Sequence, residues 1–177
     1  MSTEPDMPVS SLPAAPRARA VPRPDLALAA WLGLCYAVAG VGSLLTAPAI
    51  PTWYATLAKP PLTPPGWVFA PVWTVLYTAM AVAAWLAWRT RPSSCRRRGL
   101  RLFCVQLVLN LLWSWIFFSL HRPGLALVAI ALLGTGIAMT TRPFLTISRT
   151  AGWLMLVYLA WVTFATYLNA GIWRLNP

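Results

Sequence analysis

Three uncharged polar side chains, Gln106, Asn110 and Ser114, recur every four residues within an otherwise apolar run. That spacing places them on one face of a helix. Amide and hydroxyl groups are costly in contact with lipid, so this face is expected to turn toward the protein interior. Two interpretations remain open. The groups either form hydrogen bonds between helices, worth about 0.6 kcal/mol each, or form the polar edge of a ligand pocket.

Aromatic side chains form similar rows in two other apolar runs. Such rows are common in helix packing, but 11 Trp among 177 residues exceed what anchoring at two membrane interfaces requires. Flat aromatic walls with a few hydrogen-bonding groups suit a large, planar, mostly apolar ligand. The rows consist of Phe69, Trp73, Tyr77 and Met80, and of Tyr158, Trp161, Ala165 and Asn169.

Acidic and metal-binding side chains are nearly missing from the chain. All three carboxylates, Glu4, Asp6 and Asp25, lie in the first 25 residues, and His121 is the single histidine. Paired-carboxylate hydrolysis, His/Asp metal sites and proton relays within the membrane need groups that are absent here. The three cysteines have no metal-ligand spacing. We therefore predict no metal site and no tightly bound cofactor.

The apolar composition predicts the elements that hold these rows. The chain is 59% hydrophobic and 10% charged, against about 25% charged in ordinary domains. One soluble core of this length could not bury so much apolar surface. We predict an all-α membrane protein, a five-transmembrane-helix bundle, within residues 26–177. The spans are expected at about 26–47, 67–88, 102–120, 124–141 and 152–173.

The N-terminal residues 1–25 form a separate region. They are rich in Pro, Ser, Ala and Arg, show no helical period, and are predicted to be a disordered tail. Arg17, Arg19 and Arg23 precede an apolar run of full spanning length, which fits a cleaved signal peptide badly.

Basic residues are concentrated on one side of the predicted bundle. The net charge of +11 includes six Arg between residues 89 and 101, a pattern typical of topology signals rather than of nucleic-acid binding. The N-terminal side receives the tail, the second loop and the fourth loop with Arg142 and Arg149. The opposite side receives only Lys59, Arg122 and Arg174. In a bacterial inner membrane this bias predicts a cytoplasmic N-terminus and an external C-terminus; a bacterial or mitochondrial outer membrane is the alternative.

The loop between the first two spans, residues 48–66, contains six prolines. Proline fixes φ and reduces the entropy lost when a loop is ordered. We predict a rigid lid over the mouth of the bundle. Trp53, Tyr54 and Trp67 have a second interpretation, as part of an interfacial aromatic belt.

Three stretches carry a family resemblance: WYATLAKPPLTPPGWVFAPVWTVLY, QLVLNLLWSWIFF and YLAWVTFATYLNAGIWRLN. In this order they resemble the tryptophan-rich sensory protein/translocator protein family (TspO/MBR), the peripheral benzodiazepine receptor group, from about residue 28 onward. The resemblance implies a usually homodimeric five-helix bundle with a pocket closed by its first loop. It also implies binding of porphyrins such as protoporphyrin IX and haem, and links to tetrapyrrole handling and to regulation by oxygen, light or stress.

The resemblance assigns pocket positions residue by residue. The loop aromatic corresponds to Tyr54, the Trp of APVW to Trp73, and the Asn of QLVLN to Asn110. The Trp of YLAW is Trp161, and the small position four residues later is Ala165. With the rows above, the expected ligand-binding residues are Tyr54, Phe69, Trp73, Tyr77, Asn110, Trp113, Ser114, Trp161 and Ala165.

The chain also departs from the family pattern. Val157-Tyr158 replaces a common Pro-Tyr in the fifth span, which favours a helix without a kink. LLGTG stands where a Trp is common in the fourth span. Six residues separate Tyr167 from Arg174, one too many for the proposed cholesterol motif, so no sterol binding is expected.

Three functions remain open. The first is a receptor or carrier for a porphyrin-type ligand, embedded in membrane lipid and forming a homodimer, with no nucleic-acid partner. The second is an enzyme that degrades bound porphyrin in light, with Trp73 and Trp161 as its redox-active residues. The third is a regulatory partner of other membrane proteins.

Overall fold

The computed structural model describes residues 24–177, and within them it contains five long helices and no strand. Two short π-helical segments accompany them, one after the first helix and one that extends the third. The predicted tail, apart from its last two residues, lies outside the described residues. The elements are α1 (Pro24–Thr46), η1 (Ile50–Tyr54), α2 (Gly66–Trp88), α3 (Ser94–Ser114), η2 (Trp115–Ser119), α4 (Pro123–Ile147) and α5 (Arg149–Leu175).

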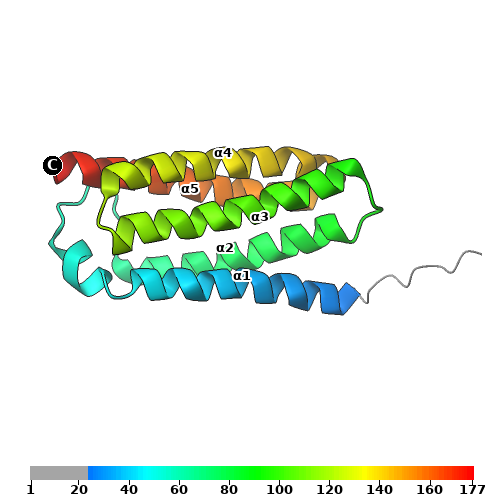
Figure 1. Ribbon diagram of the computed structural model, residues 1–177, viewed down its shortest axis with the longest axis horizontal. Helices are drawn as coiled ribbons and strands as arrows, with labels where there is room; N and C mark the ends of the chain where they lie inside the picture. Colours follow the sequence, from blue (N-terminus) through cyan, green and yellow to red (C-terminus); the bar gives the residue numbers. More distant parts are fainter. Residues whose placement is uncertain (1–23) are drawn as a thin grey trace, which may run out of the picture.

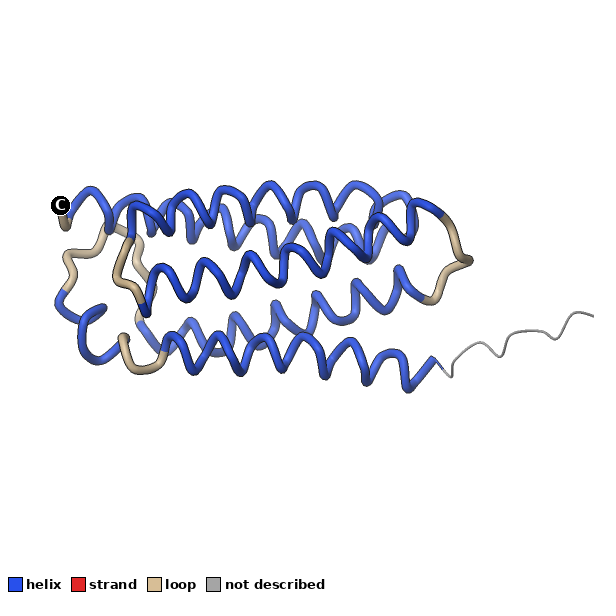
Figure 2. The backbone as a smooth tube through the Cα atoms, in the orientation of Figure 1, coloured by secondary structure: helices blue, strands red, loops and turns tan. Residues whose placement is uncertain are grey.

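The five long helices lie lengthwise beside one another (Figure 1). Each is long and apolar enough to cross a membrane, which confirms the predicted all-α bundle of five spans. The start of α1, the α2–α3 connection and the α4–α5 connection lie at one end of the bundle; the Pro-rich α1–α2 connection and the C-terminus lie at the other (Figures 1 and 2). We call these the arginine end and the proline end.

Several helix ends differ from the predicted spans. α1 begins at Pro24, two residues early. α3 begins at Ser94, so the arginines from 96 to 101 lie in its first turns rather than in a loop. α4 continues to Ile147, and only Ser148 separates it from α5. The reason is that a helix need not stop where hydrocarbon stops. Arginine is a good helix former, and the Ser93 and Ser148 side chains accept N-capping hydrogen bonds from Arg96 and Ala151.

Small residues allow close packing between the helices. A Cβ on Gly99 of α3 would lie 3.1 Å from the Phe144 ring of α4, and one on Gly136 of α4 would lie 3.4 Å from Leu109 of α3. On α2, four alanines are fully buried, including Ala81 and Ala84. By contrast, only 6% of the apolar window of α1 is buried inside the protein. α1 therefore flanks the bundle rather than filling it, which leaves room along its inner face.

Candidate ligand-binding site

A cavity of about 530 Å³ lies toward the proline end, enclosed by α1, α2, α3, α5 and the two π-helical segments. Its volume falls within the range of about 300–1,000 Å³ typical of small-molecule sites. The wall is formed by Tyr36, Ala39, Gly40, Gly42, Ser43, Thr46, Ala47, Ile50, Tyr54, Gly66, Phe69, Ala70, Trp73, Thr74, Tyr77, Asn110, Trp113, Ser114, Phe118, Trp161 and Ala165.

All nine residues expected to bind a ligand lie on this wall. They come from four elements: η1 supplies one, α2 three, α3 three and α5 two. Spacings of three or four residues bring the α2 and α3 members to one face of each helix. The structure thus brings the predicted residues together around one hollow, and their role in binding a ligand stays a prediction.

A hydrogen-bonded chain of three side chains runs from the cavity wall, where Tyr77 and Asn110 lie, to Tyr158 behind it. The Tyr77 hydroxyl donates to Asn110 Oδ1 at 2.9 Å, and Asn110 Nδ2 donates to the Tyr158 hydroxyl at 2.8 Å. All three side chains are buried. The chain joins α2, α3 and α5, so Asn110 both bonds between helices and lines the cavity. The first interpretation left open by the sequence, hydrogen bonding between helices, is confirmed for this residue, and the second, the edge of a ligand pocket, stays a prediction.

The other polar residues of α3 have different surroundings. Gln106 is buried away from the cavity, where its Nε2 lies 3.8 Å from the Met80 sulfur and its Oε1 has no partner. Ser114 lines the cavity. The predicted inward face is thus confirmed, but only its half toward the proline end reaches the hollow.

The indole of Trp113 is fixed by hydrogen bonding. Its Nε1 donates to Asn169 Oδ1 at 3.1 Å, and Asn169 Nδ2 donates to the Pro123 carbonyl at 2.8 Å. Asn169, from the predicted α5 row, is buried but does not line the cavity. Its amide holds a wall residue in place.

Two further indoles, Trp73 of α2 and Trp161 of α5, line the cavity. Trp73 lies 5.6 Å from Tyr77 and 6.4 Å from Tyr158 between ring centroids, and Phe69 meets Trp161 edge-on at 6.2 Å. The Trp161 Nε1 is buried without a hydrogen-bond partner.

The Pro-rich connection is held against α5. Asn176 Oδ1 accepts from the Ala58 backbone N–H and its Nδ2 donates to the Ala58 carbonyl, both at 3.0 Å. The Tyr167 hydroxyl donates to the Pro61 carbonyl at 3.0 Å. Pro60 packs so tightly on Gly171 that a Cβ there would lie 2.6 Å from the ring. These contacts fix the position of the segment, and its closure over the cavity stays a prediction.

Tyr54 and Lys59 lie together where this connection meets the cavity. Lys59 Nζ is 4.9 Å from the centroid of the Tyr54 ring, and Tyr54 is on the cavity wall. Burial raises the pKa of the Tyr54 phenol, which is therefore neutral at physiological pH. Trp53 of η1 stacks on His121 with ring centroids 4.3 Å apart.

The wall formed by α1 was missed from the sequence. Gly40, Gly42 and Ser43 line the cavity because they have little or no side chain. Tyr36 lines it too, and its hydroxyl lies 2.8 Å from Thr78 Oγ1 of α2. The signal for this wall was the run of small residues between Ala37 and Ser43, but small residues alone do not indicate a binding site.

Metal-binding clusters are absent from the described part of the chain: residues 24–177 contain no group of three or more His, Cys, Asp or Glu side chains that could hold an ion. The cavity offers aromatic faces, hydroxyls and one amide.

Comparison with known proteins identifies similar chains. The sequence profile of the TspO/MBR family matches residues 31–174. The tryptophan-rich protein TspO of Chlorobaculum tepidum is 42% identical over 156 residues, covering 86% of this chain and 97% of that protein. The TspO of Archaeoglobus fulgidus is 38% identical, covering 85% and 97%. The human translocator protein is 40% identical over 126 residues, covering 70% and 75%.

Proposed function

Because the chain belongs to the TspO/MBR family, we propose that this integral membrane protein is a receptor or carrier for porphyrin-type tetrapyrroles such as protoporphyrin IX or haem. The observation that carries the proposal is the cavity of about 530 Å³ walled by aromatic rings from α2, α3, α5 and η1. Relatives of this chain are named translocator proteins and tryptophan-rich sensory proteins, which is consistent with carriage or sensing of a ligand.

The chemistry of the wall supports a flat, mostly apolar ligand. Trp73, Trp161 and Phe69 offer ring faces and edges, and stacking or edge-on contacts between aromatic systems add about 0.5–1.5 kcal/mol each beyond the area buried. Asn110 and Ser114 of the wall supply a few polar groups that would orient the ring system. Sites with this composition bind their ligands by excluding water, and a few hydrogen bonds fix the orientation of the ligand.

The acidic edge of a porphyrin needs a cation at the mouth. Lys59 is the one basic residue of the Pro-rich connection, and it lies beside Tyr54 of the cavity wall. Its Nζ already donates to the Ala55 and Leu57 carbonyls at 3.4 and 3.2 Å. We propose that Lys59 pairs with a ligand carboxylate and that the Pro-rich connection acts as a lid over the cavity.

A titration of the purified protein with protoporphyrin IX, followed by quenching of tryptophan fluorescence, tests the proposal. The double variant W73A/W161A removes two wall indoles, and we expect its affinity to fall by at least tenfold. W67A/W153A is the matched control, because it removes one indole from each of the same helices at positions 76% and 64% exposed. Unchanged affinity in W73A/W161A, or an equal loss in the control, would exclude this cavity.

The enzymatic alternative is tested with the same proteins. Trp73 and Trp161 line one cavity, so electron transfer between an excited porphyrin and an indole, with oxygen as oxidant, needs no acid, base or metal. Illumination of the complex would then produce an absorbing product that free tryptophan does not yield and that W73A/W161A forms more slowly. Without such a product the protein is a binder only.

We further propose an inner-membrane location with the arginine end in the cytoplasm, on the basis of the positive-inside bias. A reporter that fluoresces only in the cytoplasm should be dark when fused after Pro177. A fluorescent fusion would show that the C-terminus lies in the cytoplasm and that the proposed orientation is wrong. The expected homodimer also stays a prediction, which light scattering of the purified protein would test.

A further inference from the structure

The arginine end of the bundle carries a high charge that the described residues do not neutralise. Residues 24–177 contain one acidic side chain, Asp25, and no ion pair forms among them. Arg96 donates to the Trp88 and Thr90 carbonyls, and Arg89 lies over the Trp85 ring at 4.8 Å. The side chains of the remaining arginines at this end are exposed and make no hydrogen bond, ion pair or ring contact in the described part: Arg91, Arg97, Arg98, Arg101, Arg142 and Arg149.

Three of these arginines continue rows of exposed apolar side chains. On α3, Arg98 and Arg101 are followed at helical spacing by Val105 and Val108, which are 52% and 64% exposed. On α4, Arg142 is preceded at the same spacing by an exposed apolar row of its own. That row consists of Met139, Leu132 and Val128, which are 43%, 53% and 57% exposed.

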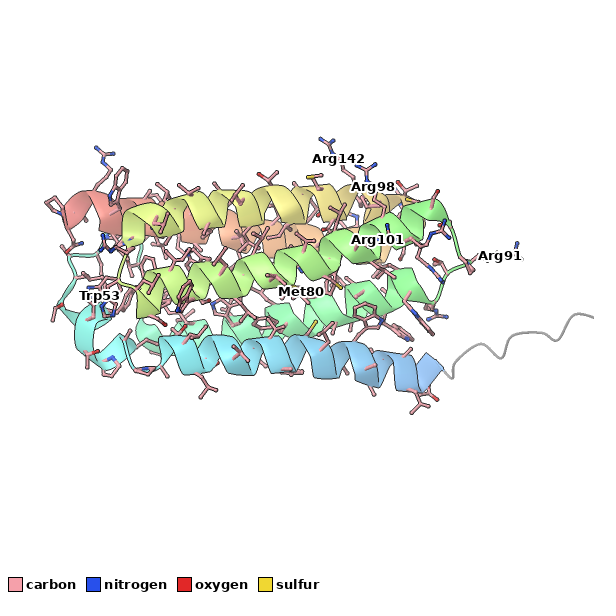
Figure 3. All side chains as sticks on the ribbon, viewed as in Figure 1. Trp53, Met80, Arg91, Arg98, Arg101 and Arg142 are labelled. Carbon is pink, nitrogen blue, oxygen red and sulfur yellow. The ribbon has the colours of Figure 1, made fainter. Side chains whose placement is uncertain are left out.

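The two rows lie on the same side of the α3–α4 pair. Arg98 comes one position before Gly99, and Arg142 comes one position before Pro143, and Gly99 contacts Pro143 and Phe144. One position is about 100° of rotation. Because the helices run antiparallel, the same rotation turns both rows to one outer face. Figure 3 shows the Arg98 and Arg142 side chains at one end of that face, pointing outward.

We propose that Arg98, Arg101 and Arg142, with the apolar rows beside them, bind an anionic phospholipid. The phosphate is held by guanidinium groups from both helices, and the acyl chains lie along the rows. Arginine matches phosphate oxygens with two parallel N–H donors. A basic cluster next to a membrane-spanning helix attracts acidic lipids.

The combination of charge and apolar surface selects this occupant over others. An acidic protein or a nucleic acid would contact the arginines alone, whereas a phospholipid of the membrane that these helices cross contacts the arginines and the apolar rows together. A second copy packed through α3 about an axis along the membrane normal would place Arg98 and Arg101 near their own copies, and like charges repel. An amphipathic anion matches both parts of the surface.

Native mass spectrometry of the full chain, released from nanodiscs of phosphatidylglycerol and phosphatidylcholine in equal amounts, tests the proposal. We expect the wild type to retain phosphatidylglycerol preferentially. In R98Q/R142Q that preference should fall by about 25-fold, because each of the two lost cations is worth about fivefold in binding near an anionic surface. Circular dichroism and thermal unfolding confirm that the variant is folded.

Two matched variants locate the site. R122Q/R174Q removes the same charge at the proline end, and R91Q/R149Q removes it at the arginine end but off the rows. Both should keep the preference. Equal loss in either would mean that total charge, and not this surface, selects the lipid. The proposal would be overturned if R98Q/R142Q kept the preference for phosphatidylglycerol. It would also be overturned if the wild type bound a short single-stranded DNA in place of lipid, or if R98Q/R142Q changed only the number of protomers.

Discussion

The Asn110 carboxamide accepts a hydrogen bond of 2.9 Å from the Tyr77 hydroxyl, although the two residues lie 33 positions apart in the chain. The same amide donates to Tyr158, so one side chain joins three helices at the wall of the cavity. Apolar packing between helices gains little in lipid, because lipid tails are as apolar as leucine. Polar connections of this kind therefore have a large share in fixing how α2, α3 and α5 face one another.

Replacement of Asn110 by Ala should destabilise the bundle. The change leaves the buried Tyr77 and Tyr158 hydroxyls without the hydrogen bonds that they make to Asn110, which costs about 1–3 kcal/mol. Thermal unfolding in detergent should show a lower midpoint than for Y77F, which removes one hydrogen bond and leaves Asn110 Nδ2 bonded to Tyr158. Equal midpoints for N110A and the wild type would mean that the amide contributes nothing to the helix arrangement.

The Pro-rich connection should loosen when its bonds to α5 are removed. In Y167F/N176A the connection loses three hydrogen bonds to Ala58 and Pro61, each worth about 0.5–1.5 kcal/mol. We expect amide hydrogen exchange within residues 55–63 to accelerate by roughly tenfold or more. T163V, which removes an exposed hydroxyl bonded only within α5, serves as the control and should leave exchange in this segment unchanged.

Gly171 should tolerate no side chain, whereas Gly134 should accept one. A Cβ at Gly171 would lie 2.6 Å from Pro60, and one at Gly134 would meet nothing within 4 Å. Both glycines are inside helices, where Ala is favoured by about 1 kcal/mol. G134A should thus raise the unfolding midpoint slightly, and G171A should lower it or displace the connection, with faster proteolysis near Pro60. If G171A raised the unfolding midpoint, Pro60 would have to move away from the new methyl group without loss of stability.

Much of the cavity wall was predictable because its residues carry functional groups and recur at helical spacing. Asn110 and Trp73 lie in rows spaced by four, and polar groups in a membrane helix must turn inward. The family resemblance selected the same positions independently. The α1 wall was not predictable, since Gly40 and Gly42 contribute space rather than functional groups.

Contacts between segments far apart in the chain also could not be predicted from the sequence. Nothing near Asn176 indicates that its amide pairs with Ala58, 118 positions away. The ends of α3 and α4 were misjudged for a different reason. Hydropathy locates where hydrocarbon ends, but helix propensity and the caps at Ser93 and Ser148 decide where a helix ends.

Enlarging Ala165 should block the cavity without unfolding the protein. Ala165 lies on the cavity wall, so a leucine there extends into open space rather than into packed atoms, and the overpacking cost of about 1–3 kcal/mol is avoided. Protoporphyrin IX should therefore bind at least tenfold more weakly to A165L, while the unfolding midpoint stays within about 2 °C of the wild type. A160L, five positions earlier on the exposed side of α5, adds the same volume facing outward and should bind normally. If A165L bound the ligand as well as A160L does, the ligand would have to occupy another part of the molecule, because the added side chain takes up room that a tetrapyrrole in this cavity needs.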